Sequence, residues 1–236
     1  MSGTRRPRRQ AIRHRPARAF VPLPMSERSA CFHGAAAHCL RIALGLKGLG
    51  EESLAACPSE PAGRTRLPAG YRRLRPAGAL PALADRDLAL SQALAIIEYL
   101  DEAFPYPPLL PADPGARAQV RAIALDLAGE RHPISHLDLP GSGSEADRDP
   151  EREAAWCRHW LESGLAAVEA RVAPHPADWK FCHGRHPTLA DCCLAPQVFN
   201  ARRLGCRLDG MPTVVRIDAE YRNLPAFVAA EPGDSR

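Results

Sequence analysis

FCHGRHPTLADCCLAPQVFNARRLG, residues 181–205, holds the clearest structural signal in this chain of 236 residues. Thr188 and Asp191 have the spacing of a capping box, in which a hydroxyl accepts a first-turn N–H and an acidic side chain accepts the N–H of the capping residue. Gly205 suits the left-handed position that follows many helices. The stretch therefore predicts a helix that Thr188 opens, that runs through Leu204, and that Gly205 closes.

Apolar residues at helical spacing predict further helices on the amino-terminal side. These helices cover residues 36–47, 91–104, 115–130 and 151–172. Gly48 is a suitable C′ residue for the first helix, and Ser91 is a suitable N-cap for the second, which Pro105 ends. The expected apolar faces consist of Ala93, Ile96, Ile97, Leu100 and Phe104, then Val120, Ile123, Ala124, Leu127 and Ala128, and finally Trp156, Trp160, Leu161, Leu165 and Val168.

Strand signals are confined to the first half of the chain. Residues 78–83 and 88–90 read as two short strands separated by the polar turn Asp85-Arg86-Asp87. Weaker patterns favour a strand near 52–56 and a short helix over 69–75. Since only helices follow, the predicted fold class is an α/β domain followed by an all-α domain.

We expect the boundaries between these parts to follow the prolines. The first 24 residues carry seven arginines and four prolines without Asp or Glu, so we predict a disordered extension, with translation from Met25 preferred to a transit peptide. An α/β domain over 25–104, a proline-rich linker over 105–114 and a helical domain over 115–236 follow. Residues 138–150 are expected to form a loop.

Charge excludes nucleic acid as the main partner. The net charge of +4 belongs to the extension, because without its seven arginines 24 basic residues face 27 acidic ones, a net charge of −3. No basic stripe with interleaved aromatic residues occurs elsewhere. No apolar run is long enough to span a bilayer, and no secretory signal is evident, so we predict a cytoplasmic protein without membrane contact.

The eight cysteines show no compact disulfide spacing, which favours a reducing compartment and buried thiols. Cys182, His183, His186, Cys192 and Cys193 contain ligand types for zinc. Their spacing fits no standard zinc finger, so we interpret these residues as structural and predict no metal.

Several stretches together resemble the zeta class of glutathione transferases, the maleylacetoacetate isomerase family. They are LRIALGLKGL (40–49), ALPAL (79–83), LSQALAIIEYLDEAFPYPPLLPADP (90–114), WCRHWLESGLAAVE (156–169), FCHG-x-x-PTLADCCLAPQVFNARR (181–203) and PTVVRID (212–218). The resemblance implies a thioredoxin-like domain followed by a helical one, a homodimer, and glutathione as cosubstrate. It also implies isomerisation of maleylacetoacetate to fumarylacetoacetate in phenylalanine and tyrosine catabolism, with possible glutathione transferase activity.

The family reaction needs a glutathione thiolate, and here the chain departs from the family pattern. The resemblance places the family's serine pair at Gly34 and Ala35, which carry no hydroxyl. A hydrogen bond to a charged group contributes about 1.5–3 kcal/mol, or roughly one to two pKa units on the sulfur. His38, Cys39 and Ser29 are substitute donors that we consider and do not favour. We interpret Cys39 as a packed helix residue and His38 as a solvated one.

The resemblance also implies residues that bind glutathione. Leu80 and Pro81 match the site where the family pairs its backbone with glutathione before a cis-proline. Gln92 and Ala93 match a Gln-Ser pair that receives the γ-glutamyl group, with the serine lost. His132 matches a contact in the second domain, although Asp138 shortly after it reverses a favourable charge.

Arg203 matches the family's arginine for the substrate carboxylate, but an arginine before Gly205 could equally complement a helix C-terminus. Substrate choice stays open as well, because diacid length is read by pocket shape. Two alternatives to a maleylacetoacetate isomerase therefore remain. One is a catalytically impaired binding protein with the glutathione-transferase fold, and the other is a maleylpyruvate isomerase.

Overall fold

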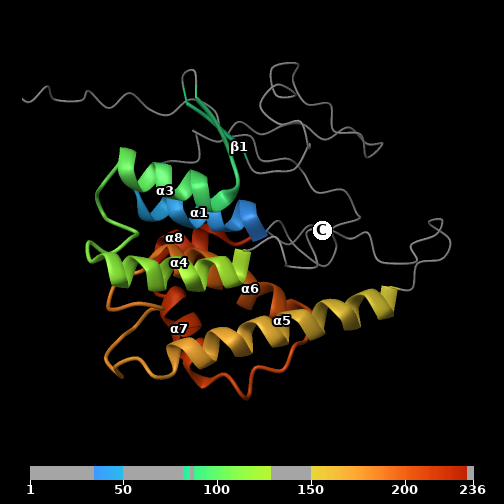
Figure 1. The fold of residues 1–236 in the computed structure, drawn as a ribbon. Coiled ribbons are helices and arrows are strands. Elements are labelled where there is room, and N and C mark those ends of the chain that lie inside the picture. Colours follow the sequence, from blue (N-terminus) through green and yellow to red (C-terminus); the bar gives the residue numbers. More distant parts are fainter. Residues whose placement is uncertain (1–34, 50–81, 86–87, 129–149, 233–236) are drawn as a thin grey trace, which may run out of the picture.

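The computed structural model describes residues 35–49, 82–85, 88–128 and 150–232 (Figure 1). Their elements, in chain order, are α1 (Ala35–Leu46), β1 (Ala82–Asp85), β2 (Leu88–Ser91), α3 (Ala93–Ala103), α4 (Pro114–Ala128), α5 (Pro150–Val172), α6 (Leu189–Arg203), α7 (Pro212–Tyr221) and α8 (Pro225–Ala230). The extension over 1–24, the strand near 52–56, the helix over 69–75 and the loop over 138–149 lie outside the described residues. The described part has the predicted order, a strand-bearing region followed by helices alone.

The strand pair is antiparallel and opens directly into α3. Leu83 pairs with Leu90, and Asp85 pairs with Leu88, so Asp85 belongs to β1 rather than to the turn that the sequence predicts. Ser91 is also not the N-cap of α3, as we expected, because it pairs with Ala82 as the last residue of β2. The helix therefore begins one residue later than predicted.

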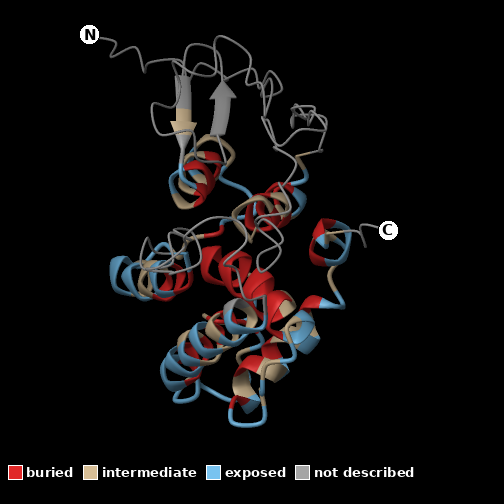
Figure 2. Cartoon of the chain, turned by 90° about the vertical axis from the view of Figure 1, so that its right-hand side faces the viewer, coloured by how far each residue is buried: buried red, intermediate tan, exposed pale blue. Residues whose placement is uncertain are grey.

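α6 forms the centre of the molecule. Twelve of its residues are buried, against α1 on one side and against α4, α5 and α7 on others, and Figure 2 shows this central helix almost entirely in the colour of buried residues. The predicted capping box of Thr188 and Asp191 is present, and Gly205 has the left-handed φ of 69° that closes the helix. Pro196 lies inside α6, a feature that the sequence reading did not anticipate.

The carboxylate of Asp191 satisfies more donors than a capping box requires. Its Oδ2 accepts the backbone N–H of Thr188 at 2.7 Å and the Thr188 hydroxyl at 2.8 Å. Its Oδ1 accepts the N–H of Cys182 at 2.8 Å and the hydroxyl of Tyr221 at 2.9 Å. Burial raises the pKa of Asp191, although these four bonds act in the opposite direction. One carboxylate thus joins α6 to α7 and to the loop that precedes α6.

A buried lysine joins the carboxyl ends of α1 and α3 to the segment between α3 and α4. The Lys47 side chain has no exposed surface and forms an ion pair with Asp101. Its Nζ also donates to the carbonyls of Phe104 and Pro107, at 2.8 and 2.7 Å. Asp101 in turn accepts the N–H of Leu109 at 2.8 Å. The proline-rich segment is therefore held by charge-assisted hydrogen bonds.

Of the fifteen residues in the three predicted apolar faces, eleven are buried, Phe104 and Trp156 are half-buried, and Trp160 and Ala128 are exposed. Trp160 is 40% exposed because it lies one residue off the buried stripe that Leu161, Leu165 and Val168 form. Ala128, the last residue of α4, is exposed as well. Among the described residues, no helix has the length and apolar character needed to cross a bilayer.

Candidate functional site

The residues predicted to form the site fall into two groups. Ala35, Gln92, Ala93 and Arg203 are described by the structure, at the amino ends of α1 and α3 and at the carboxyl end of α6. The other predicted site residues, Gly34, Leu80, Pro81 and His132, lie outside the described residues and stay predictions.

The amino end of α3 has backbone donors without a partner among the described residues. The first N–H of the helix with an intrahelical partner is that of Ile96, which donates to the Gln92 carbonyl at 3.0 Å. The N–H groups of Ala93, Leu94 and Ala95 precede it, and no side chain of the described residues caps this end. Three orphan donors at the positive end of a helix favour an anion.

Gln92 has an unusual backbone at this junction. Its φ is 73° and its ψ is 120°, a conformation that costs a residue with a side chain on the order of 1–3 kcal/mol. Its side chain is exposed, whereas Ala93 is buried. The sequence reading missed this strain, since a non-glycine residue between a strand and a helix gives no signal of positive φ.

The first three residues of α1, Ala35 to Ala37, carry no side-chain donor and offer only their backbone N–H groups. Cys39 is 3% exposed, and its Sγ lies 3.5 Å from the Sγ of Cys193 on α6. The hydrogen bond with Cys193 and burial raise the pKa of Cys39 well above its usual value. Cys39 is therefore a packed helix residue, as we interpreted it, and not a substitute for a lost hydroxyl.

His38 is not solvated, and in this respect the sequence interpretation was wrong. Its side chain is 2% exposed, and its ring meets the ring of Phe199 edge-on with 5.6 Å between centroids. The difference arises because α1 packs along α6, so the first turn of α1 faces protein on this side. His38 therefore points towards Phe199 and does not serve as an exposed donor.

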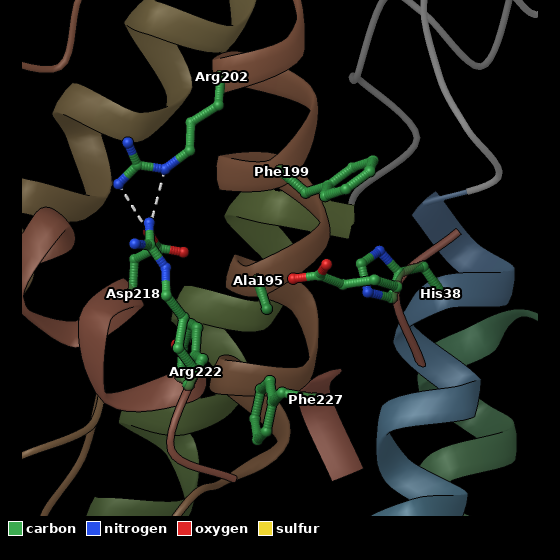
Figure 3. A pocket seen from close by; sticks show the side chains of 9 residues that line it. His38, Ala195, Phe199, Arg202, Asp218, Arg222 and Phe227 are labelled. Atoms are coloured by element: carbon green, nitrogen blue, oxygen red, sulfur yellow. Dashed lines mark hydrogen bonds and ion pairs between the residues drawn. The ribbon is translucent and has the colours of Figure 1, made fainter. Parts of the chain in front are cut away.

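Beside His38 the structure contains a small cavity of about 60 Å³ (Figure 3). Its wall includes Phe199, Arg202, Asp218 and Phe227, and Figure 3 shows Arg202 bonded to Asp218. The Nδ1 atom of His38 is buried with no hydrogen-bond partner among the described residues. Burial, with a smaller effect of Arg41, lowers the pKa of His38 to about 3. The imidazole is neutral at physiological pH and offers no cation to an anionic ligand.

Arg203 lies at the end of α6 that approaches the start of α1. His38 in the first turn of α1 contacts Phe199, and Arg203 follows Phe199 by four residues, one turn further on the same face of α6. Arg203 is exposed, whereas its neighbour Arg202 forms an ion pair with Asp218 at 2.7 Å. Both interpretations of Arg203 are compatible with this position.

The residues considered as zinc ligands occupy different environments. Cys182, Cys192 and Cys193 are buried, and His186 is exposed. Within the described part of the chain, no three His, Cys, Asp or Glu side chains are grouped as a metal site would require. The predicted burial of cysteines is confirmed for five of the six described ones, and Cys206 is half-buried.

Comparison with known proteins gives the same family over both halves of the chain. The model of the glutathione S-transferase N-terminal domain matches residues 35–103, and that of the C-terminal domain matches residues 150–230. A probable maleylacetoacetate isomerase of Vibrio cholerae is 40% identical over 205 residues, which cover 85% of this chain and 93% of the relative.

Solved structures agree with this match. A bacterial zeta-class maleyl pyruvate isomerase superposes with a TM-score of 0.76 at 33% identity and covers 92% of this chain and 100% of that one. The maleylacetoacetate isomerase of Anaeromyxobacter dehalogenans, solved with glutathione in its active site, has a TM-score of 0.68 at 30% identity, with 92% and 97% covered. The predicted fold class, a thioredoxin-like domain followed by a helical one, is confirmed. The chain therefore belongs to the zeta-class glutathione transferases, the enzyme family of the maleylacetoacetate isomerases.

Proposed function

We propose that this chain is a glutathione-dependent cis–trans isomerase that converts maleylacetoacetate to fumarylacetoacetate, in phenylalanine and tyrosine catabolism in the cytoplasm. The observation that carries the proposal is the amino end of α3, where Gln92 is held at positive φ ahead of three N–H groups that have no partner among the described residues. Such an end is suited to the γ-glutamyl carboxylate of glutathione. Relatives with this activity at about 40% identity support the assignment.

The described residues fit glutathione at its backbone but not at its sulfur. Ala93 retains the N–H that a serine would also offer, and the exposed Gln92 side chain is free to contact a peptide. At α1, Ala35 has only a backbone N–H to direct at a thiolate. We infer that Gly34, Leu80, Pro81 and His132 complete the site.

When bound, glutathione supplies the thiolate that adds to the alkene and leaves after rotation about the resulting single bond. The chain's own contribution is positioning and charge. The amino end of α1 orients its N–H groups and positive dipole towards a sulfur anion. The guanidinium of Arg203 holds a substrate carboxylate at the neighbouring end of α6, which fixes the diacid relative to α1.

A catalytically impaired glutathione-binding protein is the second candidate, and one observation favours it. Ala35 has no hydroxyl, and both polar side chains one turn further, His38 and Cys39, face α6 rather than the start of α1. The thiol of glutathione would then keep a pKa near its free value. Binding would persist while turnover would be slow.

Turnover of maleylacetoacetate with glutathione, compared between the parent chain and Gly34→Ser, tests these candidates. The isomerase proposal expects measurable turnover by the parent, and an increase of about 8- to 25-fold in the thiolate fraction at pH 7 in the variant, because a fall of one to two units from a thiol pKa of about 8.5 raises that fraction from about 3% to about 24–76%. A parent that binds glutathione but is inert, with an active variant, establishes the binding protein. If calorimetry detects no binding of reduced glutathione to the parent, both candidates are wrong.

Substrate choice needs a separate measurement. Maleylpyruvate isomerase activity is the further alternative, supported by the structural relative with that name. The ratio of kcat/KM for the two diacids decides between them, and Arg203→Ala is expected to raise KM for both.

We further propose a homodimer, with a glutathione-binding domain over 25–104 and a helical domain over 115–236. Sedimentation tests the dimer.

A further inference from the structure

The two thiols that meet between α1 and α6 are in direct contact in the core. The Sγ atoms of Cys39 and Cys193 lie 3.5 Å apart, and both residues are 3% exposed. A disulfide requires about 2.05 Å, so the sulfurs must approach by about 1.5 Å. Since no atom stands between two hydrogen-bonded sulfurs, small side-chain rotations and a slight shift of the helices supply that approach.

We propose that Cys39 and Cys193 form an oxidative cross-link between α1 and α6 when the protein meets a hydroperoxide. The inference stands on the geometry of this thiol pair and does not depend on the proposed isomerase activity. Cys182 and Cys206 have oxygen partners instead, with Sγ distances of 3.9 Å to the Tyr221 hydroxyl and to the Arg158 carbonyl. The sulfur–sulfur contact thus distinguishes this pair from Cys182 and Cys206.

The step balances without a metal or a further cofactor. One thiolate attacks an oxygen of hydrogen peroxide, which gives a sulfenic acid and, with the thiol proton, one water. The second thiol attacks the sulfenic sulfur, forms the S–S bond and releases the hydroxyl as a second water. Two thiols lose two electrons in total, and one peroxide gains them.

Burial makes this reaction slow near neutral pH. Peroxide reacts with thiolates, and the hydrogen bond and burial that raise the pKa of Cys39 keep this thiol protonated. Peroxide also reaches the pair only when α1 and α6 separate locally. We therefore expect the cross-link to form over long exposure, and faster as pH rises. Once formed, it joins positions 154 residues apart and raises Tm.

Mass spectrometry of the full chain after peroxide treatment tests the proposal. Trypsin leaves Cys39 in peptide 29–41, together with Cys31, and Cys193 in peptide 186–202, together with Cys192. The expected result is a loss of two hydrogens from the intact mass, and a 29–41/186–202 species that dithiothreitol separates. Fragmentation of this species locates the bonded cysteines without any substitution.

Matched variants remove the ambiguity within each peptide. The linked species should disappear in Cys39→Ala and in Cys193→Ala, and should persist in Cys31→Ala and Cys192→Ala. Circular dichroism verifies that each variant is folded. If a variant is not folded, fragmentation of the linked peptide from the wild-type chain identifies the bonded cysteines. A bond located at Cys31 or Cys192, or oxygen addition without any linked peptide in the folded wild type, overturns the proposal.

Discussion

The amino ends of α6 and α3 differ in how their first backbone N–H groups are satisfied. At the start of α6, the carboxylate of Asp191 and the hydroxyl of Thr188 satisfy the first donors, and Asp191 is fully buried. At the start of α3, Gln92 is exposed and the first three N–H groups have no capping side chain among the described residues. Every helix begins with such orphan donors. The start of α6 is satisfied by the protein itself, whereas the start of α3 is where we propose that a ligand binds.

The carboxyl ends make the contrast sharper. α1 and α3 are joined at their carboxyl ends by the ion pair between Lys47, whose side chain has no exposed surface, and the half-buried Asp101. Lys47 also binds the carbonyl of Phe104, the C-cap of α3. The carboxyl ends of α1 and α3 are therefore held together by charged side chains, on the far side from the amino end of α3 where we propose that glutathione binds. Fixed support behind a donor set is what a binding site needs.

Removal of the Asp191 carboxylate should have the largest effect. Asp191→Ala leaves the N–H groups of Thr188 and Cys182 and the hydroxyl of Tyr221 without their acceptor in a buried region. We expect a loss of about 4–5 kcal/mol in the free energy of unfolding, measured by urea denaturation.

The isosteric change tests whether charge or shape matters at this site. Asp191→Asn keeps one acceptor but turns the other oxygen into an NH₂ group that faces two donors, so we expect a loss of about 2–3 kcal/mol. A loss below about 1 kcal/mol in Asp191→Ala would show that the closed start of α6 contributes little to stability.

The second largest effect should come from the ion pair of Lys47 and Asp101 at the carboxyl ends of α1 and α3. Lys47→Met leaves the half-buried Asp101 without its cation, which should lower the free energy of unfolding by about 3 kcal/mol. Lys180→Met is the matched control, because Lys180 forms an exposed pair with Glu220 at 3.5 Å, and we expect less than about 0.5 kcal/mol there. Equal effects in the two variants would contradict the assigned role of Lys47.

The capped start of α6, and the ends of α1 and α6 that glycines follow, were the easier features to predict from the sequence. The capping box of Thr188 and Asp191, and the left-handed residues Gly48 and Gly205, are local patterns, and all are confirmed. The further partners of Asp191 were not foreseen, because Tyr221 lies 30 residues away and only tertiary packing brings it there. Local residue spacing therefore predicted the start of α6, whereas the hydrogen bonds of Asp191 to distant residues depend on tertiary packing.

The candidate site residues were harder to predict, for a physical reason. A site that a ligand would complete leaves no local pattern of its own, so Gln92 and Arg203 were proposed from family resemblance alone. Ser91 has good N-cap chemistry, but pairing with Ala82 holds it in β2. His38 was assigned to solvent because one polar residue in an apolar helix does not reveal which face will be covered.

Protonation of the buried His38 should give a pH-dependent effect on stability that is comparable in size with that of Lys47→Met. A histidine whose pKa falls on folding is protonated first in the unfolded chain, so its stability contribution is complete above about pH 6.5 and is lost as pH falls towards 3. The slope reaches about 1.4 kcal/mol per pH unit. His38→Phe should remove this part of the acid sensitivity in denaturation curves measured from pH 7 to pH 4, whereas the exposed control His186→Phe should retain it.

The smallest expected change in the free energy of unfolding comes from substitution of Gln92 at the start of α3. This substitution separates the effect on stability from the effect on glutathione binding. Gln92→Gly relieves a positive φ that disfavours a side chain, so the free energy of unfolding should rise by about 1 kcal/mol. The same change removes a side chain that we place against glutathione, so calorimetry should show weaker binding. Gln92→Ala loses the side chain and keeps the strain, so it should weaken binding equally without any gain in stability. If glycine stabilises the chain and leaves glutathione affinity unchanged, the strain at Gln92 serves the strand-to-helix junction rather than the ligand.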